Sequence, residues 1–275
     1  MRGLLRHPTG MVGAVLVAVV VLTAAVSLVW TPRDPLAVDP ADSWAGPSAQ
    51  HWIGADALGR DLFSQLVRGA QVTVLASVGA AVIALVVGLA FAAGIAFGSP
   101  VVSGLVQRGV DLLIAFPTLV IAIILVTSFQ ASTLMAVLAI GLGMSVAVTR
   151  TVLPELQRAL ASDFVLLARA AGARAWWIGT RHVLPSISAS LLVRLTQLMG
   201  VAALAEAGLS YLGFGTPPPT PSWGRTLADL QSQVMTQPEV LLFPALAIVV
   251  VVLGFNLLGD GLRDVLDPRA REVSA

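Results

Sequence analysis

Few side chains in this sequence have the chemistry that catalysis or metal binding needs. The chain has no Cys, which excludes thiolate nucleophiles, disulfides and Cys-ligated metal sites. Its three histidines, His7, His51 and His182, lie far apart in the sequence, so a shared metal site is not expected. Ser210 lies in an apolar segment, but a serine nucleophile needs a base beside it, and no His lies in any apolar segment. The residue types therefore do not predict an enzyme, and no metal or cofactor is expected in this chain.

The basic residues exclude one further activity. All 16 of them are Arg, and none is Lys. A P-loop ATPase needs a Lys in its phosphate-binding loop, so this chain is not expected to hydrolyse ATP. If ATP drives its activity, a partner polypeptide binds the ATP and Mg²⁺.

The composition indicates that the chain folds in lipid. Of its 275 residues, 57% are hydrophobic and 11% are charged, whereas a soluble domain has about 25% charged residues. A bilayer core needs roughly 20 apolar residues per helix, and the chain offers about six such segments. We therefore expect an all-α, polytopic membrane protein. The expected spans are residues 11–30, 72–97, 112–128, 133–149, 186–214 and 240–258.

Two ionisable residues interrupt the fifth expected span, Arg194 and Glu206. Charged side chains are costly within a membrane and face protein or water there, so both are candidates for a translocation pathway. Another interpretation places Glu206 near the outer interface, bonded to backbone of the following loop, and lets Arg194 reach the inner surface. The two residues are 12 positions apart, about 18 Å along a helix, so they cannot pair within it.

The placement of arginines predicts the orientation, because cytoplasmic loops are enriched in basic residues. With the N-terminus inside, the inner segments hold eleven arginines and the outer segments four. Both termini are therefore expected in the cytoplasm, with the first span retained rather than cleaved. The inner group is Arg2, Arg6, Arg108, Arg150, Arg158, Arg169, Arg174, Arg181, Arg263, Arg269 and Arg271, and the outer group is Arg33, Arg60, Arg68 and Arg225.

The inner loop 150–185 is longer than a simple connection needs. Ser162 or Asp163 can cap a short helix over 164–171, and Gly172 stands where a helix-ending glycine belongs. A second helical stretch, 173–183, is expected to stop near Pro185. Short apolar helices of this kind either lie in the lipid interface, which Trp176 and Trp177 suit, or fill a groove on a cytoplasmic partner.

The same loop resembles the cytoplasmic loop of binding-protein-dependent ABC importer permeases, whose pattern is E-A-A-x-x-x-G, nine residues, then I-x-L-P. Ala168, Gly172, Leu184 and Pro185 match that pattern. Leu166 stands at the position of the Glu and His182 at that of the Ile, and Arg169 lies within the motif. In that family the loop forms a coupling helix that docks on the ATPase subunit.

Three further segments resemble the dipeptide, oligopeptide and nickel permeases of that family, and in particular their C-type subunit. The segment from Glu206 to Gly215, with the Pro, Trp and Gly residues after it, is similar to E-A-x-L-S-F-L-G-x-G…P-P…P-x-W-G. The outer segment resembles H-x-L-G-T-D-x-L-G-R-D and the C-terminal one F-N-x-x-G-D-x-L-R-D. The outer motif residues are His51, Gly54, Asp56, Gly59, Arg60 and Asp61, and the C-terminal ones are Asn256, Asp260, Arg263 and Asp264.

The resemblance implies a type I importer permease fold in a bacterial inner membrane. It implies a heterodimer with a sister permease, two ATPase subunits and an extracytoplasmic binding protein, and no nucleic-acid partner. The transported solute is expected to be a small peptide, with nickel or another small solute as the alternative and a stand-alone secondary transporter as the alternative from another class. The expected regions are 1–30 (N-terminus and first span), 31–71 (extracytoplasmic loop), 72–258 (five-span core with the coupling loop 150–185) and 259–275 (cytoplasmic tail).

Two motifs and one glycine pair leave their roles open. Asp56, Arg60 and Asp61 either contact the binding protein or its solute, or form a local salt-bridged cap on the second span. Residues 260–264 either end a helix in water or clamp the coupling loop or the ATPase. Gly94 and Gly98 are expected to permit close helix packing.

Overall fold

The computed structural model describes residues 8–129 and 131–266, and these residues form a helical bundle. The all-α prediction is confirmed for them, with a single β-bridge between Ala55 and Asp61 as their only strand-like pairing. Predictions for Arg2, Arg6 and the tail beyond Leu266 lie outside the described residues. The helices are α1 (Pro8–Val26), α2 (Leu62–Phe97), α3 (Pro100–Ile114), α4 (Thr118–Ser128), α5 (Thr133–Leu160), α6 (Asp163–Ala170), α7 (Ala175–Ile178), α8 (Leu184–Tyr211), α9 (Trp223–Asp229) and α10 (Glu239–Leu266), with 3-10 turns η2 (Pro40–Asp42) and η4 (Gln231–Gln233) and a π turn η3 (Gly179–Val183).

The described residues contain five helices long and apolar enough to cross a membrane, and six spans if α3 and α4 together make one. The expected third span, 112–128, is therefore wrong as a single straight helix, because α3 and α4 meet at an angle of 95°. Pro117 stands at the break. Proline lacks an N–H and disfavours helical geometry at the residue before it, which ends α3 and starts α4 in a new direction.

Helices α2, α5 and α10 extend well beyond the apolar segments that predicted them. α2 begins at Leu62, because Asp61 caps it by accepting a hydrogen bond from the Ser64 N–H. Ten residues of the expected outer loop therefore belong to α2. α5 continues to Leu160 and α10 to Leu266, so part of the expected inner loop and tail is helical. Hydropathy marks the part of a helix that lies in lipid, whereas caps and packing decide where the helix ends.

Small residues bring α2 and α5 together. Ala76, Ala80, Ala84 and Gly88 recur every four residues on α2 and are buried. A Cβ on Gly88 would lie 2.7 Å from the Ser145 carbonyl oxygen of α5. In lipid, where apolar burial does not drive helices together, such close packing is a main source of attraction.

The expectation that Gly94 and Gly98 permit close helix packing holds only at the turn into α3, where a Cβ on Gly98 would lie 3.1 Å from Val102 Cγ1. A Cβ on Gly94 would meet only Val106, at an ordinary 3.7 Å. Gly98 is the C-cap of α2, and its N–H donates to the Gly94 carbonyl. The close contact with α5 lies further back along α2, at Gly88.

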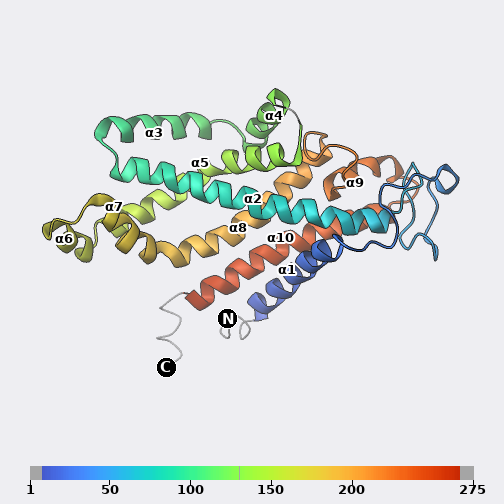
Figure 1. The fold of residues 1–275 in the computed structure, drawn as a ribbon, viewed down its shortest axis with the longest axis horizontal. Coiled ribbons are helices and arrows are strands. Elements are labelled where there is room, and N and C mark those ends of the chain that lie inside the picture. The colour runs from blue at the N-terminus through green and yellow to red at the C-terminus, as the bar shows by residue number, and fades with distance from the viewer. Residues whose placement is uncertain (1–7, 130, 267–275) are drawn as a thin grey trace.

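The bundle places the two kinds of loop at opposite ends (Figure 1). The loop between α1 and α2 and the α9 region lie at one end, and α6 and α7 lie at the other. α1 begins and α10 ends on the α6–α7 side, and these two helices run side by side. α8 packs against α2, α5 and α10 and so connects the two halves of the bundle.

Gly88→Ala is expected to destabilise the protein by about 1–3 kcal/mol, because the added methyl group overpacks the α2–α5 contact. Gly104→Ala on α3 is the matched control, since a Cβ there meets nothing within 4 Å. The control is expected to be neutral or to stabilise the protein by roughly 0.5–1 kcal/mol through helix propensity. Thermal unfolding of both variants in detergent tests the packing, and equal shifts would contradict it.

Candidate functional site

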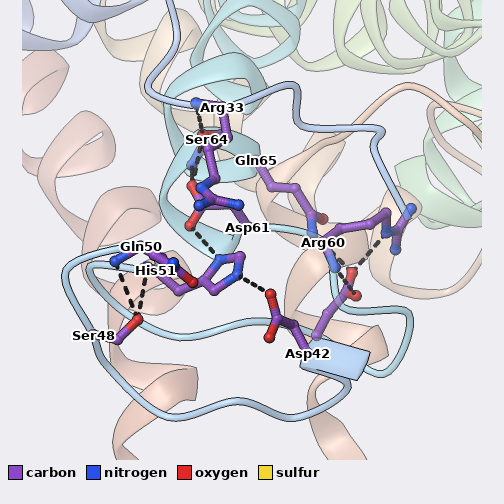
Figure 2. A network of polar contacts seen from close by, with 10 residues as sticks. Arg33, Asp42, Ser48, Gln50, His51, Arg60, Asp61, Ser64 and Gln65 are labelled. Atoms are coloured by element: carbon purple, nitrogen blue, oxygen red, sulfur yellow. Dashed lines mark hydrogen bonds and ion pairs between the residues drawn. The ribbon is translucent and has the colours of Figure 1, made fainter. Parts of the chain in front are cut away.

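The outer motif is centred on the buried ring of His51 (Figure 2). Its Nδ1 lies 3.1 Å from Asp61 Oδ1, and its Nε2 lies 3.1 Å from Asp42 Oδ2. The second oxygen of Asp61 accepts the Ser64 N–H at 2.8 Å and the Ser64 hydroxyl at 2.6 Å. Ser64 Oγ in turn accepts the Arg33 N–H at 3.0 Å. One histidine thus ties the loop to the first turn of α2.

Asp56 forms the second half of the motif, and its carboxylate is buried. One oxygen accepts the Leu58 and Arg60 N–H groups at 2.8 and 3.0 Å. The other accepts Arg60 Nε at 2.7 Å and Gln65 Nε2 at 2.8 Å. Gly59 has a φ of +73°, and a Cβ there would lie 1.8 Å from the Asp39 carbonyl oxygen. Only glycine fits this turn without strain.

Helix α9 lies at the same end of the bundle as the outer motif (Figure 1). The buried Trp223 donates its indole N–H to the Leu66 carbonyl of α2 at 2.7 Å, and Arg60 reaches to 3.8 Å from Asp229. A cavity of about 350 Å³ lies between the outer motif, residues 218–221 and α9. Arg225 lines this outer cavity and makes no ion pair with any residue that the structure describes.

At the opposite end of the bundle, α6 ends at Gly172 as the sequence predicts. Gly172 has a φ of +80°, its N–H donates to the Arg169 carbonyl at 2.9 Å, and the Ala173 N–H donates to the Ala168 carbonyl at 3.0 Å. This pair of bonds is the Schellman motif of a glycine-terminated helix. Ser162 occupies the N-cap, but its hydroxyl donates to the Ala159 carbonyl instead of capping α6.

The expected stop near Pro185 is wrong. α7 continues through the π turn η3 into α8, so the helical path does not end there. A wider π turn accommodates a ring that lacks an N–H and would clash with the preceding turn. His182, on η3, packs its ring 4.9 Å from that of Trp177 and 6.0 Å from that of Phe164.

The inner loop presents apolar side chains outward from a well-packed base. Val165, Ile178 and Val183 are fully buried and belong to one cluster with Leu156 of α5. Leu167 and Trp176 face the opposite way, with 71% and 67% of their surfaces exposed. Phe164, Leu166, Trp177 and Leu184 are exposed as well. The loop is thus firmly held on one side and open to a partner or to lipid on the other.

Arg194 pairs with Glu155 of α5, a residue that the sequence analysis did not single out. Arg194 Nη2 donates to Glu155 Oε1 at 2.5 Å, and the Ser190 hydroxyl donates to Glu155 Oε2 at 2.7 Å. A cavity of about 440 Å³ beside the pair is also lined by Arg263. Glu155 and Asp163 are the two acidic residues in the Arg-rich segment 150–185. An acidic residue among arginines is a candidate ion-pair partner, and this is the sequence signal that could have identified Glu155.

Glu206 is buried in α8 and far from that pair. The Ser210 hydroxyl donates to its Oε1 at 2.6 Å, and the Thr216 N–H donates to Ser210 Oγ at 3.1 Å. The loop after α8 thus reaches Glu206 through Ser210 rather than directly. Glu206 Oε2 has no hydrogen-bond partner among the described residues. A role for Glu206 or Arg194 in a pathway stays a prediction.

The C-terminal motif divides between packing and exposure. Asn256 donates its amide to the Val252 carbonyl at 2.8 Å and lies against Gly200 of α8. Asp260, Arg263 and Asp264 are exposed at the end of α10, and no ion pair joins them within residues 8–129 and 131–266. In the described chain these three side chains are therefore free for water or a partner.

Residues 84–272 match the family described as "Binding-protein-dependent transport system inner membrane component". The long apolar helices, the loops at opposite ends of the bundle and the short helices α6 and α7 agree with this match. The chain belongs to this family. It is a multi-pass membrane protein and a permease subunit of an ABC importer, within the peptide/nickel group.

Related permeases support the same assignment. This permease is 38% identical over 226 residues to the glutathione transport system permease protein GsiD of Escherichia coli O157:H7 and of Shigella boydii serotype 4. GsiD of Shigella dysenteriae serotype 1 is 37% identical over the same length. Each match covers 82% of this chain and 75% of the relative. Importers of this kind combine two permeases with ATPases and a binding protein.

Asp56→Ala is expected to destabilise this permease by roughly 2–4 kcal/mol, because four donors, of which Gln65 Nε2 is buried, lose the buried carboxylate that accepts them. Asp34→Ala is the matched control, since the exposed Asp34 carboxylate accepts a single hydrogen bond from the described residues, that of the Leu36 N–H. Thermal unfolding and the rate of proteolysis within residues 31–61 measure the effect. A variant as stable as the control would contradict a structural role for the outer motif.

Proposed function

We propose that this permease and a sister permease form the translocation pathway of an ATP-driven importer for small peptides. The observation that supports this most strongly is the inner loop, which is packed firmly onto α5 and α8 and exposes Leu166, Leu167 and Trp176. A lipid-lying helix pair does not need such a rigid base, whereas an element that transmits force does. The exposed apolar face fits a groove on an ATPase subunit.

The partners and the orientation follow from that role. ATP and Mg²⁺ bind to two ATPase subunits at the α6–α7 end, which is cytoplasmic and arginine-rich. An extracytoplasmic binding protein delivers the solute to the opposite end, where the rigid outer motif and α9 form a platform. The membrane is the bacterial inner membrane, and both termini are cytoplasmic.

Small peptides are the proposed solutes because the similar permeases are glutathione permeases, and glutathione is itself a small peptide. Nickel or another small solute is the alternative within the same family. A stand-alone secondary transporter is less well supported, because it needs ionisable groups at the bilayer centre. Arg194 is already paired with Glu155 near the inner loop, and it does not supply such a group.

The test is solute uptake by the complete transporter in proteoliposomes, with ATP supplied on the side of the membrane where the ATPases lie. Labelled glutathione, dipeptides, longer peptides and Ni²⁺ are compared. The proposal predicts ATP-dependent accumulation of at least one peptide class. Accumulation of Ni²⁺ alone would select the alternative solute, and uphill transport by this chain without partners would overturn the proposal.

Gly172 provides a test of the docking role. Gly172→Val is expected to strain the end of α6 by about 1–2 kcal/mol, because its φ of +80° disfavours β-branched side chains. Uptake and co-purification of the ATPases should fall in this variant and in the bulkier Gly172→Trp. Gly172→Asn is the control, since Asn tolerates this conformation. Normal uptake by Gly172→Trp would count against docking at this loop.

A further inference from the structure

Glu155, Ser190 and Arg194 connect the helix that enters the inner loop to the helix that leaves it. We propose that this cluster, the α5–α8 clasp, fixes the register of the two helices so that movement of the loop reaches the spans instead of being lost between them. The inference rests on the proposed function, because it assigns a positioning role within ATP-driven transport. The clasp residues do not need to contact solute or ATP.

The clasp adds directional hydrogen bonds to the α5–α8 contact, which is otherwise apolar and non-directional. Val152 and Leu156 on α5, and Ile187 and Leu191 on α8, are buried in one apolar cluster. Apolar contacts are non-directional, so this seam resists separation more than it resists sliding or rotation. Hydrogen bonds to a carboxylate have narrow distance and angle preferences, and they supply the missing constraint.

The geometry of the clasp suits a register lock. Ser190 and Arg194 stand four residues apart on α8, so they lie on the same face one turn apart. Each donates to a different oxygen of Glu155, at 2.7 and 2.5 Å. Sliding α8 by one turn along α5 would carry Arg194 away from Glu155 Oε1 and Ser190 away from Glu155 Oε2. A single contact would leave rotation about it free, whereas two contacts do not.

Each helix has a point near the clasp where helices commonly bend, and a lock between the helices would resist such bending. Pro154 precedes Glu155 inside α5 and leaves the Arg150 carbonyl without its helical N–H donor. The π turn Gly179–Val183 opens directly into α8. Prolines and π turns are where helices bend. Force applied at α6 and α7 would bend these two points unless the helices are held together beside them.

The exposure of the clasp decides which effect its loss should have. The side chains of Glu155 and Arg194 are 20% and 23% exposed, so water screens part of their attraction and the pair contributes modestly to folding. The apolar cluster still holds the helices when the pair is removed. Loss of the clasp should therefore reduce coupling more than it reduces stability or assembly.

The experiment measures solute imported per ATP hydrolysed by the complete transporter in proteoliposomes. Glu155→Gln is expected to lower this ratio by about fivefold or more, the lower range of known coupling effects, while ATP hydrolysis and subunit assembly persist. The charge-swapped pair Glu155→Arg with Arg194→Glu should recover most of the ratio. The control is Asp111→Asn, which breaks the exposed Arg150–Asp111 pair and should leave the ratio unchanged.

A covalent clasp gives a second measurement. The chain has no Cys, so Glu155→Cys with Arg194→Cys introduces this subunit's only thiols. A short thiol-specific cross-linker should raise the ratio again, and its reductive cleavage should lower it. A normal ratio in Glu155→Gln, or no recovery by either the swap or the cross-link, would overturn the clasp alone. A wild-type transporter that imports solute without ATP would overturn the proposed function and the clasp with it.

Discussion

The close approach of α2 and α5 is the contact on which the other features of this protein depend. Lipid solvates an apolar helix as well as another helix does, so small residues must let the backbones meet before dispersion forces can hold them. The row from Ala76 to Gly88 provides that surface, and the buried side of α5 fits it. Helix α5 then carries the inner loop, and α2 begins at the outer motif. One interface thus joins the two functional ends of the bundle.

The two ends of the bundle are held in shape by different kinds of interaction. The outer end lies outside the apolar segments, and it uses buried carboxylates that each accept several hydrogen bonds, with Asp56 and Asp61 as the centres. Such networks are directional and rigid when every member is satisfied. The inner end uses an apolar cluster for adhesion and one polar cluster for register. A rigid platform suits delivery of a solute, and a loop packed firmly on one side suits transmission of force.

Features with a local cause could be predicted from the sequence. Gly172 ends α6 because a positive φ is a property of one residue and its neighbours. The opposite placement of residues 51–61 and 164–183 follows from the number of spans between them (Figure 1). The effect of Pro185 depends on whether the preceding turn can widen into the π turn 179–183, and composition does not specify that. The bend at Pro117 is not visible in the hydropathy, because the apolar run continues through it and hydropathy carries no information about direction.

The amino-acid sequence by itself determined that this chain is a membrane protein with about six spans and that it bears motifs of an importer permease. Apolar runs and spaced motif residues are properties of the chain alone. Only the tertiary structure decided that Arg194 pairs with Glu155, 39 positions away, and that Glu206 is bound through Ser210. Ion-pair partners depend on which faces of two helices meet and at what height. A small-residue ridge and a few carboxylates set those quantities jointly, and no single segment of the sequence encodes them.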